Sequence, residues 1–206
     1  MDQGLFITFE GGDGSGKSTQ IKLLNDYLIS KGYDVVLTRE PGGTPISEKI
    51  REIILDKNNT EMDPVTEAFL YASSRAQHVA EKIKPALDAG KIVICDRFVD
   101  SSLAYQGYGR NLGDMVWEIN KYAVNGTMPD ITFLFKVDPE VGMKRATARS
   151  EKDRLEQEKI EFHKRLYEGY LQIEKDFDRI VGIDAERDIE AIHADVIQAV
   201  DELLCR

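Results

Sequence analysis

Short apolar runs recur along the chain and alternate with longer segments in which apolar residues return every three or four positions. The short runs predict five strands, at residues 5–10, 34–38, 91–95, 131–137 and 180–183. The longer segments predict helices at residues 17–30, 46–55, 64–89, 101–106, 114–125, 139–149, 158–177 and 188–204. Strands that alternate with helices are typical of a parallel sheet. The pattern therefore predicts an α/β fold, with a five-stranded parallel sheet and helices on both faces.

One segment near the middle of the C-terminal half departs from this pattern. Residues 149–165 carry eleven charged side chains in seventeen positions, with few apolar residues before Ile160. We expect the first half of this segment to be a solvated, mobile flap. The chain has no internal repeat or long linker, and its 206 residues suit one compact domain. Residues 1–206 are therefore expected to fold as a single domain.

The overall charge narrows the classes of partner. The chain has 27 basic and 37 acidic side chains, which give a net charge of -10. Such a charge repels phosphate backbones and anionic lipid surfaces, so polymeric nucleic acid and membranes are not expected partners. A small nucleotide stays possible, because a few local cations can bind it inside an acidic protein.

The cysteine content and the start of the chain bear on its location. The two cysteines, Cys95 and Cys205, form neither a disulfide framework nor a set of paired metal ligands. The first residues lack an export signal, and no run approaches the roughly 18 apolar residues of a membrane span. We expect a cytoplasmic protein.

Residues 11–18 read Gly-Gly-Asp-Gly-Ser-Gly-Lys-Ser, the phosphate-loop pattern G-x-x-x-x-G-K-[ST], between a predicted strand and a predicted helix. The glycines let backbone N–H groups converge on phosphate oxygens. Lys17 is expected to bridge the β- and γ-phosphates of ATP, and Ser18 to offer its hydroxyl to Mg²⁺. A glycine-rich turn without a ligand is the alternative, and the flanking strand and helix argue against it. The residues expected to contact ATP are Gly11, Gly12, Asp13, Gly14, Ser15, Gly16, Lys17, Ser18 and Thr19.

A phosphate loop alone does not distinguish a kinase from a GTPase, a motor or an inert nucleotide-binding module. The chain lacks a guanine-reading N-K-x-D, and the string Asp-Arg-Phe-Val at 96–99 is not a D-x-x-G switch. Asp96, at the end of the third predicted strand, can instead hold a water bound to Mg²⁺, while Arg97 can clamp a phosphate. An ordinary ion pair beyond a strand is the alternative for these two residues.

Further motifs resemble the bacterial thymidylate kinase family, whose members phosphorylate dTMP with ATP. The resemblance spans nearly the whole chain and rests on Phe-Glu-Gly at 9–11, Thr-Arg-Glu-Pro-Gly-Gly-Thr at 38–44, Ser-Arg-Ala-Gln-His at 74–78 and the run Asp-Arg-Phe-Val-Asp-Ser-Ser-Leu-Ala-Tyr-Gln-Gly at 96–107. It implies a P-loop kinase fold with a short lid at about 145–157, a homodimer, and transfer of the terminal phosphoryl group of ATP to dTMP with Mg²⁺.

The resemblance also implies an acceptor site for dTMP. Tyr71 and Arg75 lie four residues apart, so a ring and a guanidinium can approach one planar base from the same helical face. The family usually has Phe where this chain has Tyr71. Ser102, Tyr105 and Gln106 share a second helical face that borders the base and sugar in the family, and Gln106 suits the edge of thymine. Core packing of the aromatic residues and a polar helix start are the alternatives.

Other residues match the family around the acceptor's sugar and phosphate. Glu40 and Pro41 belong to a tight loop after the second strand, and Arg51 matches an arginine that reaches the monophosphate. The dTMP-binding residues implied by the resemblance are Asp13, Glu40, Pro41, Arg51, Tyr71, Arg75, Arg97, Ser102, Tyr105 and Gln106.

The phosphate loop contains Gly14 where one branch of the family has an arginine. Arg149, in the charged flap, resembles the lid arginine that other bacterial members supply, and Arg154 is a second candidate. A lid cation would neutralise the transferring phosphoryl group only when the lid is closed. The expected catalytic residues are thus Lys17, Asp96, Arg97 and Arg149.

Several points stay open at the level of sequence. Adenine is expected between the lid and residues 184–187, and the three histidines are interpreted as structural or solvated. A P-loop kinase for another nucleoside or nucleotide is the nearest alternative function. A nucleotide-dependent switch without catalysis belongs to a different class.

Overall fold

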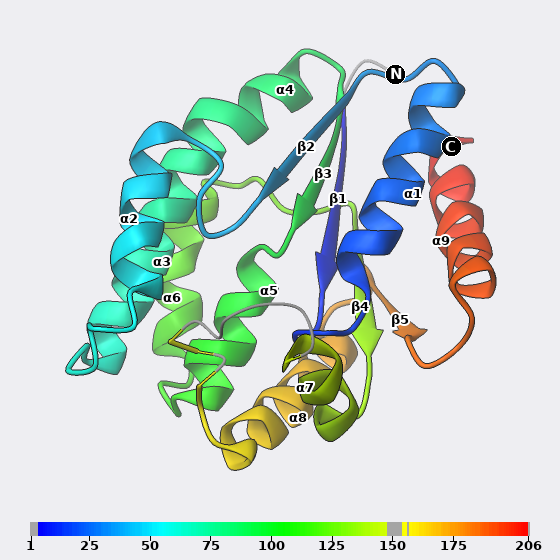
Figure 1. Cartoon of the computed structure of the whole chain (residues 1–206). Coiled ribbons are helices and arrows are strands. Elements are labelled where there is room, and N and C mark those ends of the chain that lie inside the picture. The colour runs from blue at the N-terminus through cyan, green and yellow to red at the C-terminus, as the bar shows by residue number, and fades with distance from the viewer. Residues whose placement is uncertain (1–3, 148–153, 156, 206) are drawn as a thin grey trace.

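The computed structural model describes residues 4–147, 154, 155 and 157–205. Its centre is one parallel sheet with the strand order β2-β3-β1-β4-β5 (Figure 1). The strands are β1 (Leu5–Glu10), β2 (Val35–Arg39), β3 (Ile92–Asp96), β4 (Ile131–Lys136) and β5 (Ile180–Asp184). The predicted five-stranded parallel sheet is confirmed, with strand ends that differ from the prediction by at most one residue.

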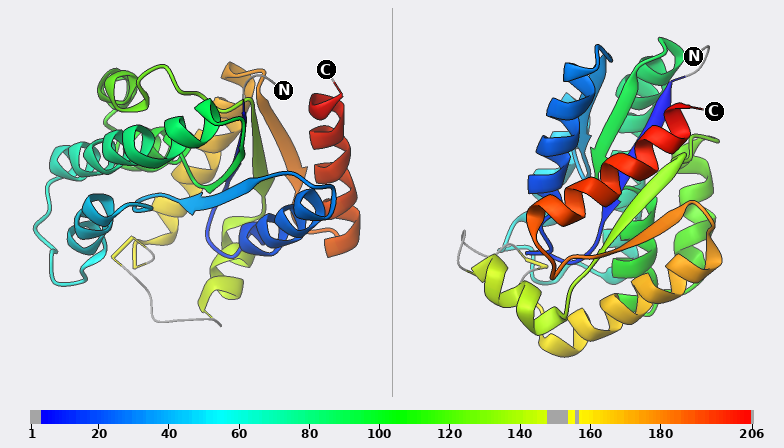
Figure 2. Two further views of the ribbon diagram at one scale, coloured as in Figure 1. Left: turned by 90° about the horizontal axis from the view of Figure 1, so that it is seen from above. Right: turned by 90° about the vertical axis from the view of Figure 1, so that its right-hand side faces the viewer.

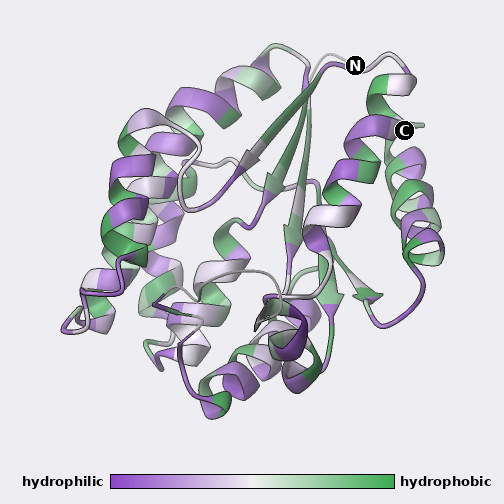
Figure 3. Cartoon of the chain, in the orientation of Figure 1, coloured by the Kyte–Doolittle hydropathy of each residue, from purple (hydrophilic) through white to green (hydrophobic). Residues whose placement is uncertain are grey.

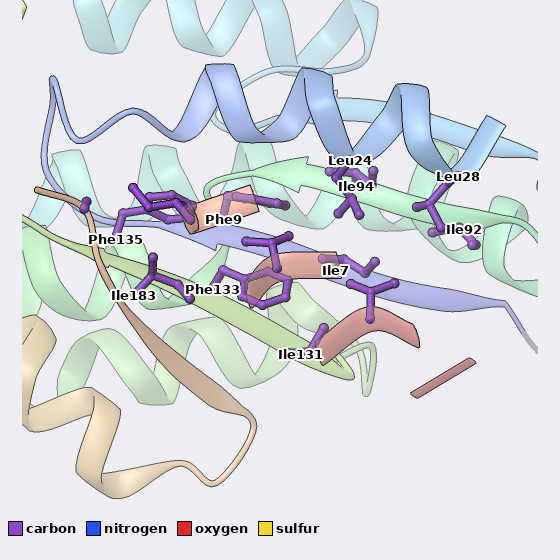
Figure 4. Close-up of a cluster of buried hydrophobic side chains, with 14 of the residues drawn as sticks. Ile7, Phe9, Leu24, Leu28, Ile92, Ile94, Ile131, Phe133, Phe135 and Ile183 are labelled. Carbon is purple, nitrogen blue, oxygen red and sulfur yellow. The ribbon is translucent and has the colours of Figure 1, made fainter. Parts of the chain in front are cut away.

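The side-chain alternation of β1 explains how the sheet is covered. Ile7 and Phe9 point to one face, where they pack with Leu24 and Leu28 of α1 (Lys17–Ser30), as Figure 4 shows. Helix α9 (Ile189–Leu204) completes this face, and α1 and α9 lie beside each other on the right of Figure 1. Among the described residues, this cluster has more buried members than either of the other two apolar clusters.

The opposite face of the sheet is covered by more helices (Figure 2). Phe6 points to this face and packs with Val79, Ile83 and Val124. The helices on this side are α2 (Pro45–Leu55), α3 (Pro64–His78), α5 (Val99–Ser102), α6 (Met115–Val124) and α8 (Ile160–Asp176). Helix α7 (Pro139–Thr147) lies beyond the carboxyl ends of the strands, beside α8 and the phosphate loop (Figure 1). The strands are mainly apolar, while the helices alternate polar and apolar stripes (Figure 3). Helices on both faces, as predicted, follow from these amphipathic stripes.

The long helix predicted at residues 64–89 is interrupted. After α3 the chain forms the π-helical segment η1 (Val79–Ile83) and then α4 (Lys84–Asp88). Pro85 has no backbone N–H, and its ring would collide with a carbonyl of the preceding α-helical turn. A π-helical turn before the proline accommodates it while the helix continues.

The helix predicted at residues 101–106 is also different. Here α5 is followed by the π-helical segment η2 (Leu103–Gly109). The wider turn of η2 changes which side chains share a face, and π-helical turns are frequent at functional sites.

Among the described residues, no helix combines the length and the apolar character needed to cross a bilayer.

Candidate functional site

The candidate site lies at the carboxyl ends of three neighbouring strands. In the parallel pairing, Phe9 of β1 and Arg39 of β2 are both opposite Asp96 of β3. The segments that follow these strands therefore start beside one another at one edge of the sheet. Such crevices beyond the carboxyl ends of strands are where α/β sheets bind ligands.

The phosphate loop turns from β1 into α1 as the sequence predicts. Gly11, Gly14 and Gly16 have φ angles of 131°, 74° and 93°, which side-chain-bearing residues rarely adopt. Ser18 is exposed at the start of α1, and Thr19 is in its first turn. The loop thus directs backbone and hydroxyl groups toward the N-terminus of a fourteen-residue helix, which favours an anion.

Lys17 is folded into this loop. Its Nζ donates to the carbonyl oxygens of Gly11 and Gly12, each at 2.9 Å. Burial, together with the nearby positive charge of Arg97, lowers the pKa of Lys17 to about 8. A bound triphosphate would add negative charge beside this buried ammonium, which already lies near the carboxylates of Asp96 and Asp13.

Asp96 and Arg97 lie directly across from the loop. Arg97 has a φ of 68°, and its Nη2 donates to Asp13 Oδ1 at 2.7 Å while Nη1 donates to the Gly11 carbonyl at 2.9 Å. Asp96 Oδ1 is buried without a hydrogen-bond partner among the described residues. Asp96 and Ser18 line one polar cavity of about 120 Å³ together with Lys17.

The orphaned oxygen of Asp96 fits a water bound to Mg²⁺, because that ion keeps several water ligands and takes few protein ligands. The part of the chain that the structure describes has no cluster of three or more His, Cys, Asp or Glu side chains suited to a metal. Ser18 and Asp96 are thus the residues that could hold Mg²⁺ alongside phosphate oxygens.

Glu10 supports this arrangement, although no role was predicted for it beyond its place in the motif at 9–11. Its carboxylate is fully buried and accepts hydrogen bonds from the backbone N–H groups of Phe98 and Ser101, at 2.7 and 3.1 Å. It also accepts from the hydroxyls of Ser101 and Tyr170, at 2.6 and 3.0 Å. Glu10 therefore holds the backbone just after Arg97. A lone charge in an otherwise apolar strand was the available signal.

A second and larger pocket, of about 220 Å³, adjoins the phosphate cavity. Asp13, Asp96 and Arg97 line both spaces. The structure brings nearly all of the predicted acceptor residues to this pocket, namely Asp13, Glu40, Pro41, Arg51, Tyr71, Arg75, Arg97, Tyr105 and Gln106. The two spaces are thus neighbours that share Arg97 in their linings.

Arg75 of α3 is a buried arginine and does not lie on the solvent-exposed surface of its helix. The residue is only 1% exposed and its Nη groups donate to Ser102 Oγ, to Asn120 and to the Phe98 carbonyl. Its Nε has no hydrogen-bond partner among the described residues, and Arg75 is one of the residues that line the larger pocket. Ser102, the remaining predicted acceptor residue, is behind Arg75 and supports it.

Glu40 is held by two buried groups. Its Oε2 lies 2.8 Å from Arg75 Nη2, close enough for an ion pair although the hydrogen-bond geometry is poor. Its Oε1 contacts His78 Nδ1 at 3.0 Å, and His78 Nε2 contacts Thr38 Oγ1 at 2.7 Å. His78 is completely buried. The interpretation of His78 as structural is confirmed, and its partner is a predicted site residue.

Tyr105 and Gln106 line the pocket from η2. The Tyr105 ring lies under the Arg97 guanidinium at 5.2 Å, and its hydroxyl donates to Asp13 Oδ2 at 3.4 Å. Gln106 Nε2 donates to Glu67 Oε1 at 2.9 Å. Arg51, from α2, donates to the Pro41 carbonyl at 2.8 Å. These contacts fix the pocket walls through three separate elements.

The structure describes only one of the two candidate lid arginines. Arg149 lies outside the described residues. Arg154 Nη2 pairs with Glu67 Oε2 at 2.7 Å, and its Nε donates to the Ile54 carbonyl at 2.9 Å. In this structure Arg154 is therefore bound to Glu67 of α3 and to the Ile54 carbonyl of α2.

Helix α7 packs against the phosphate loop at Gly14. A Cβ atom at Gly14 would come within 2.2 Å of the Gly142 carbonyl oxygen, and one at Gly142 would come within 2.8 Å of the Asp13 carbonyl. Residues 184–187, where adenine is expected, lie beside α7, since Arg145 Nη1 donates to the Ala185 carbonyl at 3.2 Å. The absence of a side chain at position 14 is thus a packing requirement in this chain.

Comparison with known proteins places this geometry in a family. The model of the family described as thymidylate kinase matches residues 9–196. A thymidylate kinase from Bacillus velezensis is 51% identical over 205 residues, which cover 98% of this chain and 97% of the relative. One from Thermoanaerobacter sp. is 52% identical over 204 residues, with 98% and 100% covered.

Solved structures agree with this result. The crystal structure of thymidylate kinase from Ehrlichia chaffeensis is 37% identical, superposes with a TM-score of 0.78, and covers 96% of this chain and 98% of its own. The predicted P-loop kinase fold is confirmed by this likeness. The chain belongs to the thymidylate kinase family.

Proposed function

We propose that this chain transfers the γ-phosphoryl group of ATP to dTMP and so forms ADP and dTDP, a step toward dTTP. The observation that carries this proposal is the pair of adjoining pockets that share Asp13, Asp96 and Arg97. A donor phosphate and an acceptor phosphate can thus meet at one guanidinium. Formation of ADP and dTDP by the purified chain with ATP, Mg²⁺ and dTMP tests the proposal.

The donor triphosphate is bound by the phosphate loop. Backbone N–H groups of Gly11 to Thr19 cradle the phosphates, and Lys17 leaves the carbonyls of Gly11 and Gly12 to contact the β- and γ-phosphates. Transfer of a phosphoryl group needs positioning and neutralisation of charge more than a protein nucleophile. Arg97 serves this need, because its fork already points at Asp13 beside the loop.

Mg²⁺ is proposed to bind with the triphosphate, where it would neutralise the phosphate charge during transfer. Ser18 would contact it through its hydroxyl and Asp96 through a water, which is supported by the unpartnered Oδ1 of Asp96. Asp96→Asn should raise the Mg²⁺ concentration needed for half-maximal rate at fixed ATP. An unchanged Mg²⁺ dependence would remove Asp96 from the metal site.

The acceptor dTMP is proposed to occupy the larger pocket. Tyr71 would stack on the base, Arg75 and Gln106 would meet its edge, and Tyr105 would pack on the deoxyribose. Arg51 and Arg97 would contact the monophosphate, with Glu40 and Pro41 beside it. This assignment is supported by the common lining of one pocket and by the free Nε of Arg75.

Residues 145–157 are proposed to act as a lid within a single domain, with Arg149 as the cation that reaches the transferring phosphoryl group. Gly14 has no room for a side chain, which favours a cation from the lid over one from the phosphate loop. Arg154 is bound to Glu67, which favours Arg149 over Arg154 for this role. Arg149→Ala should slow turnover by about 100-fold or more with little loss of nucleotide binding. An unchanged turnover would refute this role.

A homodimer is proposed from the family resemblance, and the surface of α2 and α3 supports it. Ile53 of α2 and Phe69 of α3 are each about half exposed, and the two helices pack side by side. Val65 extends this apolar surface one turn before Phe69. Light scattering should give twice the chain's 23.3 kDa, and Phe69→Lys should shift the protein toward a monomer.

The cytoplasm is the proposed location. Both cysteines are unpaired, with Cys95 buried and Cys205 exposed, as suits a reducing compartment. Fractionation of cells that express the natural chain tests this point.

A further inference from the structure

A buried carboxylate next to the larger pocket joins several elements. Glu67 of α3 is 1% exposed, and both of its oxygens are shared between donors. Oε1 accepts from Gln106 Nε2 at 2.9 Å and Arg110 Nε at 3.2 Å. Oε2 accepts from Arg110 Nη2 at 3.1 Å and Arg154 Nη2 at 2.7 Å. These groups lie 39 to 87 residues from Glu67 in the sequence.

The carboxylate is ionised at neutral pH. Burial alone would raise the pKa of Glu67, but hydrogen bonds from Arg110 and Gln106 and the charge of Arg110 hold it below its usual value. An ionised carboxylate only accepts hydrogen bonds. The amide of Gln106 must therefore turn its nitrogen toward Glu67, since the opposite orientation would set two oxygens against each other.

This orientation leaves the other end of the amide for the pocket. Gln106 Oε1 is buried without a hydrogen-bond partner among the described residues, and Gln106 lines the pocket. Arg75 Nε, a donor, is likewise buried and unpartnered among the described residues, and Arg75 also lines the pocket. Two residues of the pocket lining thus carry one unsatisfied acceptor and one unsatisfied donor, and each is costly to leave unpaired.

The two unsatisfied groups match one class of base. Thymine and uracil have a ring N–H at N3 next to a carbonyl oxygen at C4. A protein that binds this edge therefore needs an acceptor for N3–H and a donor for the C4 oxygen. Cytosine has the reverse pattern, with an acceptor at N3 and an amino group at C4. A Gln106 amide turned the other way would present its nitrogen and would suit cytosine's N3.

We infer that Glu67 is the positioning residue that sets the base selectivity of the acceptor site, because it locks the Gln106 amide with its oxygen toward the base. This inference rests on the proposed function, since it concerns how the dTMP pocket chooses its base. Glu67 itself need not touch the acceptor.

The test compares acceptors in Glu67→Gln, whose neutral side chain lets the Gln106 amide turn over. The ratio of kcat/KM for dTMP to that for dCMP should fall by about tenfold or more. The ratio for dTMP to dUMP should stay unchanged, because both bases present the same N3–H and C4 carbonyl. Loss of rate in equal proportion for all three acceptors, or no change in any ratio, would overturn the inference.

A reciprocal exchange separates positioning from general damage. In Glu67→Gln combined with Gln106→Glu, the new amide can donate to one oxygen of the new carboxylate and leave the other oxygen facing the pocket. Preference for dTMP over dCMP should recover at least in part, whereas Gln106→Glu alone should lose activity because two carboxylates would meet. Failure of the double variant to recover selectivity, despite a normal melting temperature, would contradict the inference.

The matched control is Arg154→Ala, which removes one partner of Glu67 and leaves Gln106 Nε2 on the carboxylate. Its dTMP to dCMP ratio should equal that of the unmodified chain, whatever happens to turnover. A changed ratio would assign selectivity to the Arg154 contact and not to the amide orientation. If the unmodified chain showed no preference for dTMP, the proposed function would fail before any variant was compared.

Discussion

Arg97 and Asp13 form an ion pair of 2.7 Å at the point where the phosphate cavity meets the larger pocket. Asp13 belongs to the phosphate loop and Arg97 follows β3, so the pair joins the donor side to the acceptor side. Burial would raise the pKa of Asp13, but the charges of Arg97 and Lys17 keep it below its usual value. The carboxylate is thereby available to hold the guanidinium in place.

Arg97→Lys should reduce kcat by about 100-fold or more and leave ATP binding nearly unchanged. A lysine keeps the charge but lacks the planar fork that reaches both Asp13 and the Gly11 carbonyl. Steady-state kinetics and a nucleotide titration measure the two effects. Lys121→Ala, which removes an exposed cation of α6, is the control and should behave like the unmodified chain. A kcat within twofold of normal for Arg97→Lys would contradict the role of the fork.

Nucleotide binding should take up a proton above about pH 8. In the free protein, burial and Arg97 lower the pKa of Lys17 to about 8, and the charge of a bound triphosphate raises it again. Affinity should therefore weaken as pH rises above 8, by at most about tenfold per pH unit, and should be level with respect to this group below 8.

Calorimetry at pH 9 in two buffers of different ionisation enthalpy measures this uptake. The heat should depend on the buffer for the unmodified chain and lose much of that dependence in Lys17→Met. Equal proton uptake in both proteins would show that another group titrates.

Gly14→Ala should lower thermal stability by several degrees, at a cost of about 1–3 kcal/mol. The residue has a φ of 74°, and its Cβ would meet the Gly142 carbonyl at 2.2 Å. Gly12→Ala is the matched control in the same loop, because no atom lies within 4 Å of a Cβ there. Equal melting temperatures for the two variants would mean that α7 does not pack tightly on the loop.

The stability that Glu10 contributes should depend on pH between about 4.5 and 7. Burial and the charge of Asp100 raise the pKa of Glu10 from 4.5 to about 7. The folded state then binds the proton more tightly than the unfolded state, so this contribution is full below pH 4.5 and is lost as pH rises to 7.

Glu10→Gln mimics the protonated side chain and cannot titrate, so comparison with this variant isolates the pH-dependent contribution of Glu10 to the free energy of unfolding. The free energy of unfolding of the unmodified chain, minus that of the variant, should fall by up to about 3 kcal/mol between pH 4.5 and 7. Denaturant unfolding at a series of pH values measures the difference. Parallel curves for the two proteins would show that Glu10 does not titrate in this range.

The sequence was sufficient for the sheet and the phosphate loop, because both depend on local patterns. Each strand has five or six residues, most of them apolar, and the loop needs glycines at fixed positions before Lys17. The π-helical turns were not predicted. Pro85 was visible in the sequence, but a break, a kink and a π-helical turn are all consistent with a proline in a helix.

The supporting contacts of the site could not be predicted, because they join residues that are distant in the chain. Glu10 meets Tyr170 across 160 positions, and Glu67 meets Arg154 across 87. Arg75 matched the family motif, yet only the packed structure shows that it is buried with Nε alone left over. Residue type and local spacing do not show which distant residues meet, because only the folded chain brings them together.

Acceptor specificity tests the central claim most directly. The purified chain would be given ATP and Mg²⁺ with dTMP, dUMP, dCMP, dGMP, AMP or thymidine, and ADP and phosphorylated product would be measured. The proposed function predicts the highest kcat/KM for dTMP, with dTDP as product. An equal or higher kcat/KM for another acceptor, or binding of ATP without any transfer, would contradict it.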